Sequence, residues 1–258
     1  AAREFGKTWM ALEIAYAVAS GGRFLCWEAE SPNGVIYIDG EMPLIVLQER
    51  LYQIDKSRGQ QKKVILKIVN PDVQEFGIPD LSTTEGQNEI DALISDEIKL
   101  VVLDNLSTLF RSGKEYDSDS WLPVQEWLLR LRSRGKSVLL IHHAGKSGQQ
   151  RGTSRREDVL DTVITLKRPA EYKQQDGACF EVFFEKNRGL YGDEVKPFEA
   201  HLKSHLNEDG VKTFEWSWRS LEDSTFEKVC RLSCDGLSNT DITQELGIDK
   251  STVSRHVK

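Results

Sequence analysis

The residues with the clearest chemical potential stand at the start of the chain, in the run Gly6-Lys7-Thr8. A phosphate loop follows the pattern G-x-x-x-x-G-K-[ST], in which backbone N–H groups surround the phosphates, the Lys reaches the terminal phosphate and the hydroxyl binds Mg²⁺. Counting back five positions from Gly6 gives Ala1 instead of Gly, and Ala is compatible with a tight turn in allowed backbone space. The pattern predicts a nucleotide and Mg²⁺ site; the alternative is a helix start that resembles the loop by chance. The loop residues are Arg3, Glu4, Phe5, Gly6, Lys7, Thr8 and Trp9.

Two acidic residues follow short apolar runs that are typical of buried strands. Asp104 comes after Leu100–Leu103, where a carboxylate at a strand tip holds the magnesium shell of a phosphate site. Glu41 comes just after a run ending at Asp39 and is placed to polarise an attacking water. Ligands of open α/β sheets bind beyond the carboxyl ends of the strands, so we expect both acids to meet the phosphate loop. The alternative for either acid alone is a solvated strand-end residue.

The elements that must position these residues alternate along the first part of the chain. Helical spacing over residues 8–20 ends at Gly21-Gly22, a glycine helix-end signal. Further strands are expected at 34–40, 64–69, 100–104 and 137–142, and further helices at 43–52, 85–96 and 121–134. This alternation predicts an α/β fold with a parallel sheet and helices on both faces. Four strand-like runs without helices then predict an antiparallel extension, at 159–166, 179–184, 195–202 and 211–218.

Composition limits the class of protein. A chain of 258 residues suits one core domain plus a small module. No apolar run is long enough for a membrane span and no secretory signal is recognisable, so we expect a soluble protein of the cytoplasm without a membrane role. The four cysteines do not form the paired pattern of a zinc site, and we expect reduced thiols. The net charge of -7 argues against a surface that coats DNA, although local basic loops remain compatible with DNA binding.

Several segments, taken in order, resemble the RecA/DnaB-type ATPases of the AAA family, in the branch of plasmid RepA helicases and RadA-like ATPases. They are AREFGKTWMALEIAYAVASGG, VIYIDGEMP, VVLDNLSTL, LLIHHAGKSGQQRGTSRREDVLDTVITLKRP and EKNRGLYG, and the resemblance covers about residues 1–218. It implies a RecA-like core that hydrolyses ATP with Mg²⁺ and works as a homo-oligomer, with a hexamer as one form of the ring. It also explains Ala1 and implies that a first strand lies upstream of that residue.

The resemblance implies a role for individual residues of the nucleotide site. Lys7 and Thr8 would contact phosphate and magnesium, Glu41 would be the catalytic base and Asp104 the magnesium-associated acid. His142 and His143, at the tip of the strand ending at Ile141, resemble the sensor that reports the terminal phosphate. Strand alternation points the two imidazoles in opposite directions, which leaves open which one is the sensor and which one packs in the core.

Lys186 and Arg188 follow an apolar strand and match a K-x-R pair of DnaB-like rings. The resemblance implies that this pair reaches the nucleotide of a neighbouring subunit, where a guanidinium stabilises charge on the transferring phosphoryl group. The enzyme would then need an oligomer for activity. The alternative is a solvated basic turn.

A polar segment, AGKSGQQRGTSRRED, follows the last core strand and contains too little apolar surface to pack. In the ring ATPases that it resembles, the loop at this place faces the channel and grips single-stranded DNA. The alternative is a surface loop in which Gly152-Thr153-Ser154 caps a helix. The candidate DNA contacts are Lys146, Arg151, Arg155 and Arg156.

The tail over residues 221–258 has the outline of a helix-turn-helix, separate from an ATPase domain over residues 1–218. A support helix is followed by a helix at 239–246 with Ser238 as its amino-terminal cap, a turn at Gly247-Ile248 and a recognition helix that begins at Lys250. The tail holds five basic and seven acidic residues, so a packing or oligomerisation module is the alternative to duplex DNA binding. The candidate DNA contacts are Lys250, Ser251, Thr252, Ser254 and Arg255.

Together these features favour an ATP-hydrolysing oligomer that acts on DNA, as a helicase or a replication-initiation ATPase. Two other interpretations stay open. One is a DNA-binding regulator whose nucleotide sets the oligomeric state, and the other is a RadA-like recombination or repair ATPase.

Overall fold

The computed structural model describes residues 6–59, 64–112, 121–143, 158–169, 172, 178–206 and 212–257. The chain divides into two compact units. The first contains Ala1–Leu160 and Asn207–Phe214, and the second contains Asp161–Leu206 and Glu215–Lys258. The boundary predicted between residues 218 and 221 stays a prediction.

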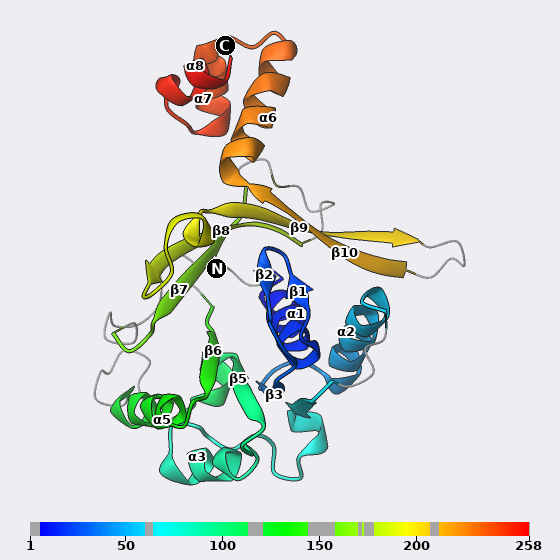
Figure 1. Ribbon diagram of the computed structural model, residues 1–258, viewed down its shortest axis with the longest axis vertical. Helices are drawn as coiled ribbons and strands as arrows, with labels where there is room; N and C mark the ends of the chain where they lie inside the picture. The colour runs from blue at the N-terminus through cyan, green and yellow to red at the C-terminus, as the bar shows by residue number, and fades with distance from the viewer. Residues whose placement is uncertain are drawn as a thin grey trace. The chain divides into compact units, whose positions relative to one another are not determined.

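The first unit is built on a four-stranded sheet, shown in Figure 1. Its strands are β3 (Gly34–Asp39), β4 (Leu66–Val69), β5 (Ile98–Asp104) and β6 (Ser137–Ile141), in the order β4-β3-β5-β6. Every neighbouring pair is parallel. Asp39 of β3 lies opposite Asp104 of β5, and Asp104 lies opposite Ile141 of β6. The carboxyl ends of these three strands therefore meet at one edge, as predicted.

Helices cover both faces of this sheet, which confirms the predicted α/β arrangement. On one face lie α1 (Lys7–Ser20) and α2 (Leu44–Ser57), and on the other lie α3 (Thr84–Asp91), α4 (Leu106–Leu109) and α5 (Leu122–Ser133). Successive side chains of a strand point to opposite faces, so the two cores draw on alternate positions of β3 and β5. The core on the α1 and α2 face joins strand residues Val35, Tyr37, Leu100 and Val102 to helix residues Leu12, Ala15, Leu47 and Ile54. The core on the opposite face joins strand residues Ile36, Ile38, Val101 and Leu103 to helix residues Ile90, Trp127 and Leu131.

Some local elements of the first unit differ from the prediction. A short hairpin of β1 (Arg23–Phe24) and β2 (Trp27–Glu28) follows α1, and a 3-10 turn, η1 (Pro71–Val73), follows β4. Helix α3 begins at Thr84, capped by the Thr83 hydroxyl, and ends at Asp91, so the helix predicted to residue 96 is shorter. The chain must reverse direction between Asp91 and Ile98, where β5 begins, so the residues between them form turns instead of a longer helix.

The second unit contains the antiparallel sheet that the sequence predicts. Its strands are β7 (Thr162–Lys167), β8 (Ala178–Asn187), β9 (Phe198–Leu206) and β10 (Lys212–Ser220), in the order β10-β9-β8-β7. The unit boundary crosses β10, because its residues up to Phe214 are assigned to the first unit. Strand β8 is antiparallel to both β7 and β9. A 3-10 turn, η5 (Gly192–Val195), precedes β9, so the strand predicted from residue 195 begins at Phe198.

Three helices follow β10: α6 (Leu221–Cys234), α7 (Asn239–Leu246) and α8 (Lys250–His256). Their small apolar core is centred on Val229, Ile242 and Val253, one residue from each helix, and all three are fully buried. Ser238 caps α7, as predicted, by accepting a hydrogen bond from the Asp241 N–H. No helix in the described part of the chain is long and apolar enough to cross a membrane.

Candidate nucleotide site

The site begins at the junction between Gly6 and helix α1. Gly6 has φ 79°, a left-handed conformation that glycine adopts without the steric cost of a Cβ atom. Lys7 is the first residue of α1 and is only 9% exposed. The cap residue, Gly6, has no side chain with which to accept from the first N–H groups of the helix. Those N–H groups therefore remain suitable donors for an anion such as phosphate.

Lys7 and Asp104 are two buried groups of opposite charge at this edge of the sheet. Burial lowers the pKa of Lys7 to about 8, and the charges of Asp104 and Glu41 partly oppose that shift. The Asp104 carboxylate is 3% exposed and accepts a hydrogen bond from the Tyr37 hydroxyl, with 2.7 Å between Oδ2 and the phenolic oxygen. The structure thus brings Lys7, Asp104 and Glu41 into one electrostatic environment, which is the arrangement expected for a phosphate and Mg²⁺ site.

The lowered pKa of Lys7 predicts that nucleotide affinity depends on pH. Nucleotide phosphates favour the charged ammonium, so binding above pH 8 must take up a proton on Lys7. Below pH 8, we expect Lys7 to cause no change in the Kd for ATP with pH. Above pH 8, we expect this Kd to rise by up to about tenfold per pH unit. Titration calorimetry at pH 7 and pH 9 in buffers of different ionisation enthalpy measures both effects. Lys7→Arg is the control because its guanidinium stays charged; a wild-type Kd that does not change to pH 9 contradicts the prediction.

Glu41 lies in the turn after β3 and is held by residues from two other strands. The Asn105 side chain, directly after β5, donates from Nδ2 to Glu41 Oε2 at 2.6 Å. His143, just after β6, has its Nε2 3.9 Å from the same oxygen. His142 and His143 are both half-buried. The structure therefore brings His143 to the predicted base, and the assignment of a sensor remains a prediction.

The turn that carries Glu41 is fixed by residues that sequence reasoning missed. Asp39 Oδ2 accepts hydrogen bonds from the Met42 N–H at 2.8 Å and from Asn70 Nδ2 at 2.9 Å, and Asn70 also donates to the Met42 carbonyl. Burial raises the pKa of Asp39 to about 6. A Cβ atom on Gly40 would lie 2.4 Å from Thr108 Oγ1, so this position requires glycine. The signal in the sequence was an acid, Asp39, at the end of the apolar run of β3.

A second cation, Arg50 on α2, acts on the acids Asp39 and Asp104 and was not among the predicted site residues. Its guanidinium lies 5.1 Å from the centroid of the Trp9 ring, an arrangement typical of a cation–π contact. Burial lowers its pKa, while Tyr37, Asp104 and Asp39 oppose the shift. Arg50 shares a helical face with the buried Leu47 and Ile54, and a lone arginine on a buried face was the signal in the sequence.

Other predicted site residues lie elsewhere or outside the described residues. Arg3, Glu4 and Phe5 of the loop, and the basic residues Lys146, Arg151, Arg155 and Arg156, lie outside the described residues. Thr8 and Trp9 follow Lys7 in α1. Lys186 lies in β8 and Arg188 follows it, in the second unit. The Arg188 N–H donates to the Asp161 carbonyl at 2.8 Å, and the two side chains are 3.6 Å apart. The roles of this pair stay predictions.

The residues proposed to contact duplex DNA occupy the outward side of α8. Lys250, Ser251, Ser254 and Arg255 are exposed, whereas Val253 is fully buried in the three-helix core. Thr252 is partly buried, and its N–H donates to Asp249 Oδ1 at 2.9 Å. Four of the five candidate contacts are therefore exposed and Thr252 is not, and the DNA contact itself stays a prediction.

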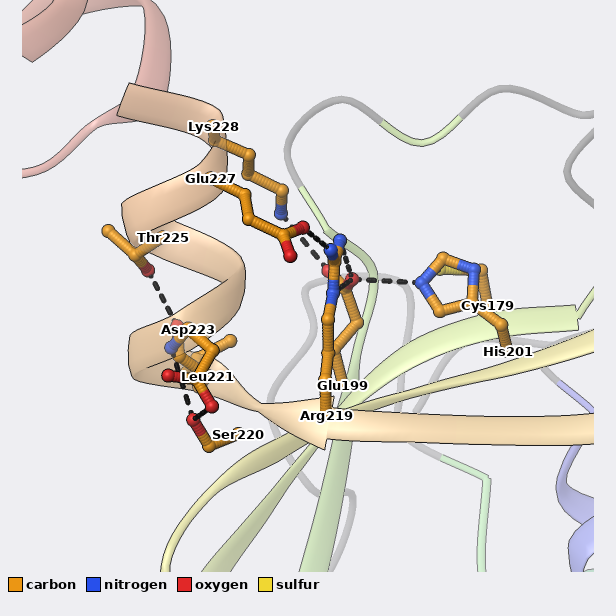
Figure 2. A network of polar contacts seen from close by, with 10 residues as sticks. All are labelled: Cys179, Glu199, His201, Arg219, Ser220, Leu221, Asp223, Thr225, Glu227 and Lys228. Carbon is orange, nitrogen blue, oxygen red and sulfur yellow. Dashed lines mark hydrogen bonds and ion pairs between the residues drawn. The ribbon is translucent and has the colours of Figure 1, made fainter. Parts of the chain in front are cut away.

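A second polar cluster, shown in Figure 2, contains three residues of metal-ligating type: Cys179 of β8, and Glu199 and His201 of β9. His201 Nε2 lies 3.4 Å from Cys179 Sγ and 2.8 Å from Glu199 Oε1, and the three ligand atoms all lie within 4.8 Å of one another.

The Glu199 carboxylate, however, is already paired with two cations. Its Oε1 accepts from Arg219 Nε at 3.1 Å and Nη2 at 2.8 Å, and its Oε2 accepts from Lys228 Nζ at 3.0 Å. A divalent ion would add two positive charges beside these cations, and Coulomb repulsion in a buried site disfavours that. We therefore interpret the cluster as an ion-pair junction, the Glu199 junction, that joins α6 and β10 to β9.

The fold and the first site together define a class of protein: a P-loop ATPase domain with a RecA-like α/β fold, a class that generally binds ATP with Mg²⁺. The chain belongs to the AAA_25 family, described as an AAA domain, whose model matches residues 1–149. The predicted RecA-like fold and the ATPase class are confirmed, and the particular branch, helicase or recombinase, is not tested by this match.

One solved structure supports the fold at low sequence identity, and a second match is weaker. A KaiC-like protein from Pyrococcus horikoshii is 16% identical, with a TM-score of 0.51 over 83% of this chain and 86% of that chain. The RadB recombinase is 16% identical, with a TM-score of 0.49 over 81% of this chain and 86% of that chain. No curated protein matches the sequence.

Proposed function

We propose that this protein is an oligomeric enzyme that hydrolyses ATP to act on DNA, as a helicase or a replication-initiation ATPase in the cytoplasm. The observation that carries the hydrolysis is the meeting of Asp104 and Glu41 at one edge of the sheet, where Asn105, next to Asp104, binds Glu41 and the charges of both acids act on Lys7. Lys7 holds the terminal phosphate by charge-assisted hydrogen bonds. Glu41 accepts a proton from the attacking water, a contribution that positioned general bases supply to catalysis.

The residues at the start of α1 fit a magnesium ion as well as a nucleotide. The helix start follows a glycine cap, the Thr8 hydroxyl stands in its first turn, and Asp104 is a buried carboxylate whose charge acts on Lys7. Hydroxyl and carboxylate oxygens are ligands that Mg²⁺ prefers. Thr8 and Asp104 would hold the ion, which when bound would neutralise phosphate charge.

The proposed oligomer rests on Lys186 and Arg188. In the proposal, Arg188 of one subunit stabilises the terminal phosphate of its neighbour, and its side chain is more than half exposed, as a residue that reaches outward requires. We expect Arg188→Ala and Lys7→Ala proteins to be inactive alone and to regain part of the ATP turnover when mixed. Co-assembly is verified by light scattering; mixed assemblies without any recovery contradict action in trans.

The proposed DNA contacts are of two kinds. The basic residues Lys146, Arg151, Arg155 and Arg156 supply a sequence-independent grip on single-stranded DNA, which is sensitive to salt. The outward side of α8 supplies contacts to duplex DNA. The deciding experiment is strand displacement from a forked duplex. The proposal requires displacement that depends on ATP, falls with salt and disappears in Lys7→Ala.

A second candidate is favoured by the compact α6–α8 module, with its buried core and its exposed polar side. In that case the protein is a sequence-specific DNA-binding regulator, and nucleotide binding controls its oligomeric state. ATP turnover unaffected by single-stranded DNA, together with tight binding to one duplex sequence, would select this candidate. A RadA-like recombination or repair role is distinguished by strand exchange without displacement.

A further inference from the structure

Asn105 is a buried amide that connects β5 to the turn carrying Glu41. It follows Asp104 directly and is only 2% exposed. Both ends of its side chain are used: Oδ1 accepts from the Ser107 N–H at 3.0 Å and caps α4, and Nδ2 donates to Glu41 Oε2 at 2.6 Å. Because the cap requires an acceptor toward Ser107, the amide must present its NH₂ group to Glu41.

The Glu41 side chain, by contrast, is long and exposed to solvent. It is 61% exposed, and a glutamate in such a place has many rotamers to choose from. A general base is effective only within hydrogen-bond reach of the water that it deprotonates. A donor on a rigid strand end that binds one carboxylate oxygen restricts the direction of the other.

We propose that Asn105 is a positioning residue for ATP hydrolysis: by binding Oε2 of Glu41, it leaves Oε1 aimed to receive the proton of the attacking water. The inference rests on the proposed role of Glu41 as base. In the step itself the water oxygen bonds to the terminal phosphorus, and the bond from that phosphorus to the bridging oxygen breaks. ADP keeps the electron pair, and the water proton passes to Glu41.

Two substitutions separate positioning from support of the fold. Asn105→Asp keeps an acceptor for the Ser107 N–H but puts a carboxylate oxygen in place of the Nδ2 donor, next to Glu41. Asn105→Ser keeps a capping hydroxyl and removes the donor without adding charge. Asn88→Asp, at an exposed position of α3, is the matched control for the charge change.

We expect both Asn105 variants to lower kcat by at least about tenfold. In Asn105→Ser, which adds no charge, the Kd for ATP and the unfolding temperature should stay close to those of the wild type. Asn105→Asp should also unfold at a lower temperature than Asn88→Asp, because it places a buried carboxylate beside Glu41. Combined with Glu41→Gln, Asn105→Ser should cause no further loss, because a residue that works through Glu41 has no effect once the base is absent. A purely structural role would instead give additive losses and a lower unfolding temperature.

Wild-type kcat in Asn105→Ser, or losses that add in the double variant, would overturn the positioning role while leaving the proposed function intact. A wild-type protein that binds ATP but does not turn it over would overturn the proposed function, and the role of Asn105 with it. The two failures are therefore told apart by the wild-type assay alone.

Discussion

Glu41→Gln is expected to lower kcat for ATP hydrolysis by about 10² to 10⁴-fold, the range that a positioned general base supplies. The amide has the shape of the carboxylate but does not accept a proton from water. Neither Lys7 nor Asp104 is altered, so the Kd for ATP should stay within about threefold of the wild-type value, as for an interaction made only in the transition state.

The control for this experiment is Glu89→Gln, which removes the same charge from an exposed position of α3. ATP binding is measured by calorimetry and turnover by phosphate release, each at pH 7.5. Turnover of Glu41→Gln within about threefold of the wild type would show that the base lies elsewhere, and the side chain to test next is Asp39, which ends the same strand with a buried carboxylate.

The parallel sheet was predictable because its strands are short apolar runs, each followed by a polar residue or a glycine. β3 is buried along its whole length and β5 at all but one position, so both appear in the sequence as continuous apolar segments. Lys7, Glu41 and Asp104 were predictable for a related reason: parallel strands end at one edge, so residues at those ends must meet. These arguments need only local pattern and topology.

Asn70 and Asn105 were not predictable by the same reasoning, because their roles depend on contacts between distant segments. Asn70 lies 31 positions from Asp39, and Asn105 lies 64 positions from Glu41. Each is a polar residue in an ordinary loop or helix when only its neighbours in sequence are considered. A buried polar group must find a partner, yet the sequence alone does not say which one.

Glu199→Ala is expected to lower the free energy of unfolding of the second unit by about 3–5 kcal/mol, the range for removing one partner of a buried ion pair. Glu199 is 1% exposed, and its loss leaves the ammonium of Lys228, which is 17% exposed, without its buried counter-charge. The control is Glu227→Ala, which removes the other acidic partner of Arg219 at a side chain that is 61% exposed. That exposed pair should contribute no more than about 1 kcal/mol.

The same junction predicts how stability changes with acid. Burial acts to raise the pKa of Glu199, but its hydrogen bonds to His201, Arg219 and Lys228 prevail and hold that pKa far below the ordinary value of 4.5. The folded state therefore ionises Glu199 at lower pH than the unfolded chain does. Its contribution is fully present above pH 4.5 and is lost as the pH falls below that value.

The measurement must report on the second unit, because a chain of two compact units need not unfold in one transition. Hydrogen exchange of the amides of β9 and α6, followed at pH 7 and pH 4, provides that local value. The difference between wild type and Glu199→Ala should be largest at pH 7 and shrink at the lower pH. Equal protection in Glu199→Ala and Glu227→Ala would instead mean that the apolar contacts of the unit hold α6 on the sheet, and that the Glu199 junction serves only to neutralise a buried charge.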